Sequence, residues 1–260
     1  MEDRLQKEFL IIKDYQSGIG SHELAKKYNY KTHKSILDIL KKHNIPRRNT
    51  QEMQRQNTSY ANLSFRTIDT KEMAYCIGLL LTDGYISEKK DSVCIGIDLT
   101  DLNAIKLVST VLQSKIITIK PKNPNHLIKY RVTIFGKQFL KDLSRLGIIP
   151  RKTFTTPGPN LNSEEKVFLK YIIRGIIDGD GWIRKDGKEF FISTASENFA
   201  KWCLDSLEEL GFKNLKIKFY KNDYNGYYLI RNASKENIKI LKSIYSDKLG
   251  MEAKRSLLLG

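Results

Sequence analysis

The chain has 260 residues, of which 45 are Lys or Arg and 29 are Asp or Glu, and 40% of its residues are apolar. This length allows one large domain or two smaller ones, and the apolar fraction is high enough to build a buried core, so disordered and collagen-like classes are excluded. No apolar run reaches 18 residues, and the acidic residues near the start are atypical of a signal peptide. We therefore expect an intracellular protein, in the cytoplasm or an organelle matrix, that does not bind membranes.

The cysteines and histidines do not form a pattern that is typical of disulfides or metal sites. The three cysteines are odd in number and scattered through apolar stretches, which excludes a disulfide framework and a CxxC site. The four histidines lack the spacing of metal ligands, so we interpret them as ordinary surface or core residues. These residues are Cys76, Cys94, Cys203, His22, His33, His43 and His126.

The net charge of +16 indicates a nucleic-acid partner, and double-stranded DNA is the partner that we expect. A generally basic proteome would produce the same balance, and this alternative stays open. The surplus is spread along the chain, because residues 1–70 hold five of the sixteen excess positive charges. This distribution favours a long interface that follows a nucleic-acid backbone.

The first 45 residues predict three short helices, over 4–16, from 21 onward, and over 32–42. A short helix, a tight turn near Asn29 and a basic amphipathic helix are typical of a helix-turn-helix module, in which the last helix enters the major groove of DNA. Lys31 and Lys34 are therefore candidate DNA contacts. A small helical cap with a solvated lysine face would show the same pattern.

Residues 46–69 are polar and almost without aliphatic side chains, which predicts a linker. Such a segment can lie along DNA. Arg47 and Arg48, at its start, are further candidate DNA contacts.

From residue 70 onward the chain repeats itself at a constant offset, so that Asp83 corresponds to Asp180 and Gly78 to Gly175. The stretches KEMAYCIGLLLTDG (71–84) and FLKYIIRGIIDGDG (168–181) are apolar helical runs that end in Asp-Gly. We predict two αββαββα half-domains, residues 70–160 and 161–260, which form one saddle-shaped α+β domain about a pseudo-twofold axis.

The elements predicted after each helical run come in the same order. In the first half-domain they are strands at 85–87 and 93–99, a helix at 102–112, strands at 115–120 and 128–135, and a helix at 137–146. In the second they are strands at 182–184 and 189–194, a helix at 197–210, strands at 215–221 and 226–231, and a helix at 235–245.

Small residues recur four positions apart in each of the two runs. Gly78 is followed by Thr82, and Gly175 by Gly179, so each pair lies on one helix face where another backbone can approach closely. We predict that the two helices pack on each other through these residues. We also expect the glycines of the two Asp-Gly pairs to end the helices in a left-handed conformation.

Asp83 and Asp180 fall at the C-terminal ends of these helices, where the helix dipole is already negative. If the helices pack together, two carboxylates meet at one negative end, so that one pKa must rise or a cation must lie between them. A divalent cation with oxygen ligands, Mg²⁺ or Mn²⁺, satisfies both groups. The last carbonyls of Thr82 and Gly179 are further candidate metal ligands.

The stretches CIGLLLTDG (76–84) and IRGIIDGDG (173–181) resemble the two LAGLIDADG motifs of the monomeric homing endonucleases, and the resemblance extends over about residues 70–260. In that family the acidic residues at the ends of the motif helices bind the metals that cut the two DNA strands. The resemblance therefore implies that Asp83 and Asp180 are catalytic metal ligands. The first motif departs from the family at Leu81 and Thr82, which replace the usual Asp-Ala.

The family also places a basic residue in each active site, after the closing helix of each repeat. The resemblance maps this role onto Lys152 and Lys254, which would stabilise charge on the phosphate or perturb the attacking water. Solvated surface lysines in a lysine-rich chain are the alternative.

The resemblance implies a monomeric, site-specific endonuclease that serves intron homing and leaves short 3′ overhangs. No histidine lies near either Asp-Gly pair, which argues against an HNH-type histidine base, and no GxxxxGK[ST] loop is present for nucleotide hydrolysis. Two other classes stay open: a DNA-binding regulator that does not cut, and a maturase that binds intron RNA.

Period-2 alternation along the predicted strands assigns a set of polar side chains to the sheet faces that point away from the helices. A two-stranded ribbon fits the major groove, where Arg and Lys can reach guanine. A solvated sheet face carries the same alternation, so DNA contact stays open for each residue. The candidates are Lys120, Lys129, Arg131, Thr133, Arg184, Lys216, Lys218, Tyr220 and Arg231.

Overall fold

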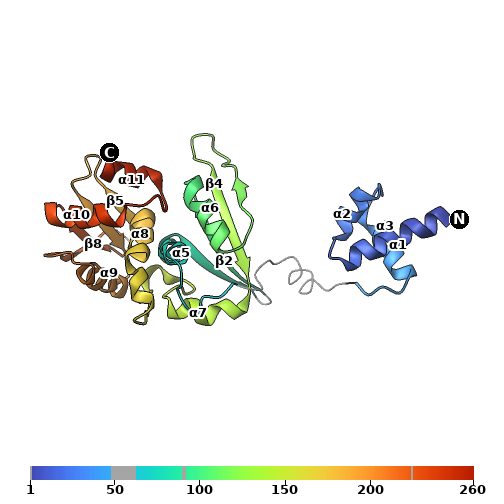
Figure 1. Cartoon of the computed structure of the whole chain (residues 1–260), viewed down its shortest axis with the longest axis horizontal. Helices are drawn as coiled ribbons and strands as arrows, with labels where there is room; N and C mark the ends of the chain where they lie inside the picture. Colours follow the sequence, from blue (N-terminus) through green and yellow to red (C-terminus); the bar gives the residue numbers. More distant parts are fainter. Residues whose placement is uncertain (1, 48–62, 90–91, 224) are drawn as a thin grey trace. The chain divides into compact units, whose positions relative to one another are not determined.

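The computed structural model describes residues 2–47, 63–89, 92–223 and 225–260 (Figure 1). The chain divides into two compact units, Met1–Ala61 and Asn62–Gly260, and each is described on its own. None of the helices in the described residues is long and apolar enough to cross a membrane.

The first unit is a bundle of three helices, α1 (Glu2–Gln16), α2 (Ser21–Lys27) and α3 (His33–Lys42). Apolar residues of all three helices form its core, and Asn29 makes the turn before α3 with a φ of 58°. The buried carboxylate of Glu8 accepts hydrogen bonds from Lys42 (2.8 Å) and His43 (2.7 Å). These bonds lower the pKa of Glu8 to about 2 and attach the end of α3 to α1. The three predicted helices are present, while the DNA-binding role of α3 stays a prediction.

The second unit consists of two repeats that each contain one four-stranded antiparallel sheet, in the orders β1-β2-β4-β3 and β5-β6-β8-β7. The predicted α+β class and the two αββαββα repeats are confirmed. In the first repeat the elements are α5 (Lys71–Thr82), β1 (Gly84–Lys89), β2 (Ser92–Leu99), α6 (Leu102–Val111), β3 (Ile117–Ile119), β4 (Lys129–Phe135) and α7 (Leu140–Arg145). In the second they are α8 (Leu169–Asp180), β5 (Gly181–Ile183), β6 (Phe190–Thr194), α9 (Glu197–Glu209), β7 (Ile217–Tyr220), β8 (Tyr227–Asn232), α10 (Lys235–Ile244) and α11 (Glu252–Leu259).

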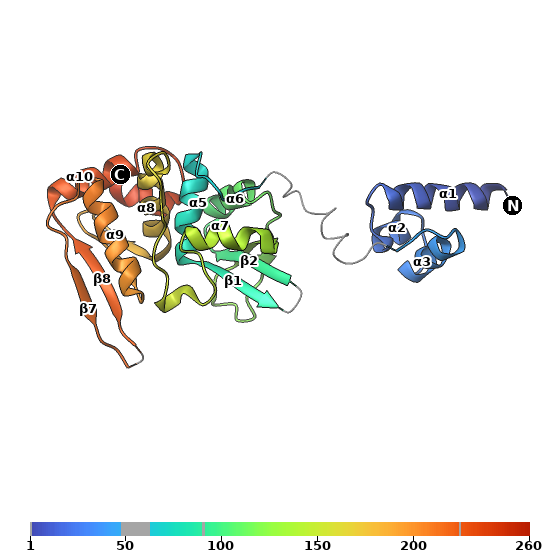
Figure 2. The ribbon, with the colours of Figure 1, turned by 90° about the horizontal axis from the view of Figure 1, so that it is seen from below.

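Helices α5 and α8 lie side by side between the two repeats (Figures 1 and 2). Glycines make this approach possible, because a Cβ on Gly78 would overlap the carbonyl oxygen of Ile172, and one on Gly175 would overlap that of Tyr75. Nearly every residue of α5 is buried. The two repeats therefore share one core that is built around this helix pair.

The prediction of left-handed glycines at the ends of α5 and α8 is wrong. Neither Gly84 nor Gly181 has a positive φ, and each is the first residue of a strand. A Cβ on Gly181 would lie 2.5 Å from the carbonyl oxygen of Ile177, and one on Gly84 would overlap that of Leu80. Glycine is required here because the strand leaves the helix end with almost no clearance, not because of its φ.

One face of each sheet packs against helices and is apolar. In the first repeat Ile95, Ile97, Val132 and Ile134 are buried beneath this layer. The residues that alternate with them along the strands point to the opposite face, and Lys129, Arg131 and Thr133 belong to this set. The predicted alternation along β4 is therefore present.

We expect Gly175→Ala to destabilise the second unit by about 1–3 kcal/mol, because the added methyl group meets backbone that cannot move aside. Thermal unfolding of the full chain would measure this loss. Lys170→Ala, at an exposed position of the same helix, is the control and should change stability by less than about 0.5 kcal/mol. Equal stability of Gly175→Ala and the parent would contradict the close packing of α5 on α8.

Candidate active site

The two predicted acids come together at the ends of the packed helices. Asp83 caps the C-terminus of α5, Asp180 is the last residue of α8, and both side chains are exposed to solvent. Gly179 lies directly against the other helix, since a Cβ there would be 2.7 Å from Oδ2 of Asp83 and would overlap the hydroxyl of Thr82. The two carboxylates therefore share one edge of the helix interface.

The electrostatics of this edge show the expected repulsion. Partial burial, and then the charge of Asp83, raise the pKa of Asp180 to about 6. Burial also raises the pKa of Asp83, against the opposing effects of a hydrogen bond from Thr82 and of nearby lysines. Two carboxylates at the negative ends of two helices make this edge a site that favours positive charge.

Lys152 and Lys254 supply part of that charge. The ammonium of Lys152 donates to the carbonyls of Leu81 (2.7 Å) and Thr82 (2.6 Å), at the end of α5. Burial lowers the pKa of both lysines, against the attraction of the nearby aspartates. Each lysine lies at the end of the motif helix of its own repeat, where the resemblance to the family had placed it.

Lys254 occupies the corresponding place in the second repeat. Its ammonium donates to the carbonyls of Ile177 (2.6 Å), Asp178 (2.7 Å) and Gly181 (2.7 Å). An ammonium has three N–H donors, so Lys254 uses all of them on backbone, whereas the bonds of Lys152 described above use two. Both lysines thus bind backbone carbonyls at the C-terminal end of a motif helix, although the Ile177 carbonyl also accepts the Gly181 amide.

The hydrogen bonds of Lys152 occupy one of the predicted metal ligands, the Thr82 carbonyl. The Thr82 carbonyl already accepts a bond from Lys152, and its hydroxyl donates to the Leu79 carbonyl (3.0 Å). A metal ion could use the Thr82 carbonyl only in competition with this ammonium. The ligand roles of Thr82 and Gly179 stay predictions.

Two carboxylates are a donor set that suits Mg²⁺ or Mn²⁺. In the part of the chain that the structure describes, no group of three or more His, Cys, Asp or Glu side chains could hold a metal ion. Mg²⁺ commonly binds through one or two carboxylates, while water and phosphate oxygens complete its octahedron. A hollow of about 100 Å³ that is lined by Asp180 and Lys152, among others, leaves room beside Asp180.

A buried polar network next to the acids was not predicted from the sequence. The carboxylate of Asp178 is buried and accepts hydrogen bonds from the hydroxyls of Tyr75 (2.7 Å) and Tyr245 (2.6 Å). Arg174, one turn earlier on α8, is buried completely. A signal was present in the sequence, because the matching residues of the first repeat are the aliphatic Ile77 and Leu81.

The open face of the first sheet carries an arginine that is already paired. Arg131 lies opposite Asp98 and donates two bonds to its carboxylate, from Nε and Nη2, each 2.6 Å long. Lys129 is exposed at the start of β4, Lys120 is exposed just after β3, and Thr133 is partly buried. The structure therefore brings these predicted contacts together but gives Arg131 an acidic partner that the sequence analysis did not foresee.

The second sheet repeats this arrangement with Glu189, whose carboxylate is buried and accepts bonds from Arg184 (3.1 Å) and Arg231. Arg184 also donates to Asp186 (2.7 Å). Tyr220 stacks on Tyr227, with ring centroids 5.4 Å apart. Other predicted contacts are exposed, and Arg48 lies outside the described residues; the exposed ones are Lys31, Lys34, Arg47, Lys216 and Lys218.

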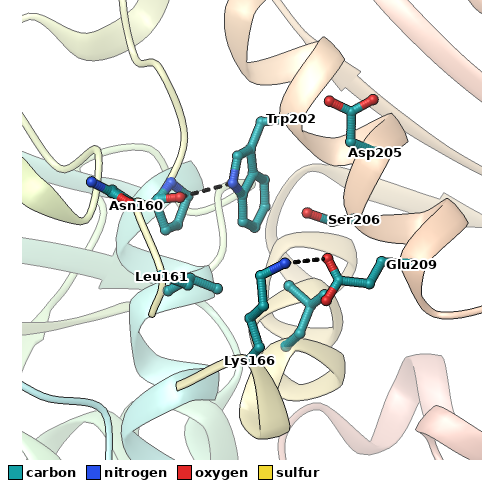
Figure 3. Close-up of a pocket in the computed structure, with 9 residues that line it drawn as sticks. Asn160, Leu161, Lys166, Trp202, Asp205, Ser206 and Glu209 are labelled. Atoms are coloured by element: carbon teal, nitrogen blue, oxygen red, sulfur yellow. Dashed lines mark hydrogen bonds and ion pairs between the residues drawn. The ribbon is translucent and has the colours of Figure 1, made fainter. Parts of the chain in front are cut away.

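A second hollow, of about 250 Å³, lies between α9 and the segment that connects the two repeats, which contributes Pro159, Asn160 and Leu161 (Figure 3). Trp202 donates from its indole nitrogen to the Pro159 carbonyl (2.8 Å), and Lys166 pairs with Glu209 (2.8 Å). Neither Asp83 nor Asp180 lines this hollow. Its contacts hold the connector against the second repeat, and we assign it no ligand.

Part of the second repeat matches a known protein family. Residues 168–245, from the second motif helix to the end of α10, match the family described as "LAGLIDADG-like domain". A comparison with curated protein sequences gave no match. The chain therefore carries a LAGLIDADG-like domain, and the resemblance that its two motifs show is confirmed.

The chain is also similar to several solved structures. The endonuclease I-DmoI in complex with DNA and Ca superposes with a TM-score of 0.50 at 19% identity, covering 72% of this chain and 96% of that chain. The homing endonuclease I-WcaI bound to its DNA recognition sequence gives a TM-score of 0.49 at 14% identity, with coverage of 78% and 93%. The N-terminal LAGLIDADG domain of DUF199/WhiA gives 0.45 at 15% identity, with coverage of 82% and 98%. At these identities the likeness to I-DmoI establishes the fold.

The raised pKa of Asp180 predicts how stability depends on pH in metal-free buffer. Between its ordinary pKa of 3.8 and about 6, the folded protein keeps a proton that the unfolded chain has released. This group's contribution to stability therefore falls as pH rises through that window. We expect Asp180→Asn, which cannot ionise, to be more stable than the parent above pH 6 and similar to it near pH 4.

Thermal unfolding across pH 4–8 in the presence of a chelator measures this difference. Asp205→Asn, at an exposed acid on α9, controls for the change in net charge alone. A parent that is more stable than Asp180→Asn at pH 7 would show that Asp180 is not under repulsive strain.

Proposed function

We propose that this chain is a divalent-metal-dependent, site-specific DNA endonuclease that cuts both strands of its target. One observation carries the proposal: Asp83 and Asp180 meet at the C-terminal ends of two helices whose close packing forces them together. This arrangement is unfavourable for a protein without a cation, since burial, and then the charge of Asp83, raise the pKa of Asp180 to about 6. Locally unfavourable groups of this kind are typical of functional sites.

The chemistry of the site suits phosphodiester hydrolysis. Asp83 and Asp180 would hold Mg²⁺ or Mn²⁺, and the bound ion would supply an activated water and neutralise charge on the phosphate and on the leaving 3′ oxygen. The complex of I-DmoI with DNA and Ca supports a DNA substrate and a divalent cation for this fold. Two acids in two related half-sites favour one cut in each strand, so a single chain suffices and we expect a monomer.

The two lysines keep positive charge beside the acids. The bonds described for Lys152 use two of its three N–H donors, so it would need to break fewer backbone bonds than Lys254 to contact a DNA phosphate. Both ammonium groups lower the pKa of Asp180 and so favour the ionised form that a metal requires. We therefore expect substitution of either lysine to slow cleavage.

The open sheet faces are the DNA-binding surface in this proposal, and α3 of the first unit adds a second contact. Exposed basic residues line both regions, and the total charge of +16 provides a long-range attraction. A DNA substrate places the protein in a compartment that holds DNA, and homing of an intron is the biological role that we propose.

Replacing Asp83 or Asp180 with Asn should abolish cleavage, because each change removes one of the two carboxylates that would hold the metal. The assay uses a supercoiled plasmid that carries the uninterrupted insertion locus, with and without Mg²⁺. DNA binding in Ca²⁺ should persist, since the phosphate and base contacts come from other residues. Asp205→Asn should cut at the parental rate.

The same experiment distinguishes the alternatives. A parent protein that binds the plasmid in Ca²⁺ but leaves it intact in Mg²⁺ and Mn²⁺ would be a DNA-binding regulator. A parent that binds intron RNA more tightly than this DNA, without cutting it, would be a maturase. Parental cleavage rates in both Asn variants would refute the proposed metal site.

The affinity for DNA should depend steeply on salt if contacts with the backbone dominate. About eight phosphate contacts imply a slope of log K against log[salt] of roughly −7. Lys31→Ala with Lys34→Ala should make this slope shallower by about 2, because two phosphate contacts are lost. Lys13→Ala with Lys26→Ala removes the same charge from α1 and α2 of the first unit and is the control. An unchanged slope in the variant with Lys31→Ala and Lys34→Ala would contradict the helix-turn-helix interpretation.

A further inference from the structure

Two buried charged residues on α8, Arg174 and Asp178, form hydrogen bonds to the segment between α10 and α11. The guanidinium of Arg174 is fully buried and lies 4.6 Å from the centre of the Tyr245 ring. It donates to the carbonyls of Ile244 (3.2 Å) and Asp247 (3.3 Å), and also to that of Leu249. These bonds fix the backbone between α10 and α11.

Asp178, one turn further along α8, forms hydrogen bonds to the same C-terminal segment. Its Oδ1 accepts from the Tyr245 hydroxyl (2.6 Å), and its Oδ2 accepts from the Tyr75 hydroxyl (2.7 Å) and from the Met251 amide (3.0 Å). One buried carboxylate thus joins α5, α8 and the C-terminal segment. The Tyr75 ring also presses on Gly250, where a Cβ would lie 2.6 Å from the ring.

The Met251 amide matters because Met251 is the N-cap residue of α11, and α11 carries Lys254. The side chain of Asp178 holds the start of this helix, while its backbone carbonyl accepts a bond from the Lys254 ammonium (2.7 Å). Asp178 therefore sets the position of Lys254 at two points. Lys254 lies three residues after Met251, so a shift of the N-cap moves the ammonium with it.

The motif helix of the first repeat, α5, lacks the two charged residues that provide this support. The residues at the places of Arg174 and Asp178 are Ile77 and Leu81, and both are aliphatic and buried. Lys152 belongs to a single 3₁₀ turn, Lys152–Phe154, rather than to an α-helix. The two lysines reach matching positions through unlike scaffolds.

We propose that Asp178 and Tyr245 are positioning residues that hold Lys254 at the end of α8, so that the two strands of DNA are cut by half-sites with different supports. This inference rests on the proposed nuclease function. It assigns to the second half-site a dependence on a buried polar network that the first half-site does not share. Loss of the network should therefore slow one cut and spare the other.

Tyr245→Phe is the informative variant, because it removes the hydroxyl that donates to Asp178 but keeps the ring that packs on Arg174. The substrate is supercoiled plasmid that bears the target, with each strand labelled. The first cut gives open-circle DNA and the second gives linear DNA, and the labels identify the strand that is cut. We expect one strand to be cut about tenfold more slowly, so that nicked plasmid accumulates. Binding to the plasmid in Ca²⁺ should be unchanged.

The double variant tests whether the effect passes through Lys254. Lys254→Met alone should slow the same strand, and Tyr245→Phe added to it should slow that strand no further. A general loss of structure would instead add to the effect of Lys254→Met and slow both strands. Tyr228→Phe is the control, since it removes a hydrogen bond from another tyrosine to a carboxylate, that of Glu197 (3.2 Å), in the same repeat.

Hydrogen exchange separates failure of this inference from failure of the nuclease proposal. In the parent, the Met251 amide should be protected by its bond to Asp178, and Tyr245→Phe should speed its exchange more than Tyr228→Phe does. Unchanged exchange, or equal slowing of both strands by Tyr245→Phe, would overturn the positioning role. A parent that does not cut DNA would refute the nuclease function and the catalytic part of this inference. The exchange data would still show whether the Tyr245 hydroxyl supports the hydrogen bond between Asp178 and the Met251 amide.

Discussion

The contact between α5 and α8 is the constraint on which the rest of the second unit depends. Gly78 and Gly175 let the two backbones meet, and a methyl group on either would overlap a carbonyl oxygen of the other helix. This closeness joins the two repeats into one core. It also fixes Asp83 and Asp180 beside each other at two negative helix ends, so the packing and the chemistry of the site have the same cause.

Lys152 and Lys254 stabilise the two carboxylates at these negative helix ends. Each ammonium is bound to carbonyls at the C-terminal end of a motif helix, and each lies close enough to the acids to lower the pKa of Asp180. The same bonds restrict what the site can do, because the Thr82 carbonyl is shared between Lys152 and any cation that approaches it. The protein thus holds a site for positive charge whose donors are partly occupied by its own side chains.

The sequence was sufficient to predict the repeats, the sheet alternation and the two acids, because these depend on local periodicity and on a repeat that can be read by eye. It was not sufficient for features that depend on distant pairing. Asp178 is bound by Tyr75, 103 residues away, and Arg131 by Asp98, 33 residues away. Helix α11 was missed because its eight residues, EAKRSLLL, show no clear apolar stripe and are held by Asp178 instead.

Three arginines on the open sheet faces are paired with acidic side chains, which the net charge alone does not reveal. Arg131 is held by Asp98, and Arg184 and Arg231 share Glu189, so any contact of these side chains with DNA begins with the loss of a charge-assisted hydrogen bond. A phosphate or a guanine edge can offer two acceptors in return, while most other groups cannot. If these faces bind DNA as proposed above, Asp98 and Glu189 would weaken indiscriminate binding more than a well-matched contact, which favours specificity.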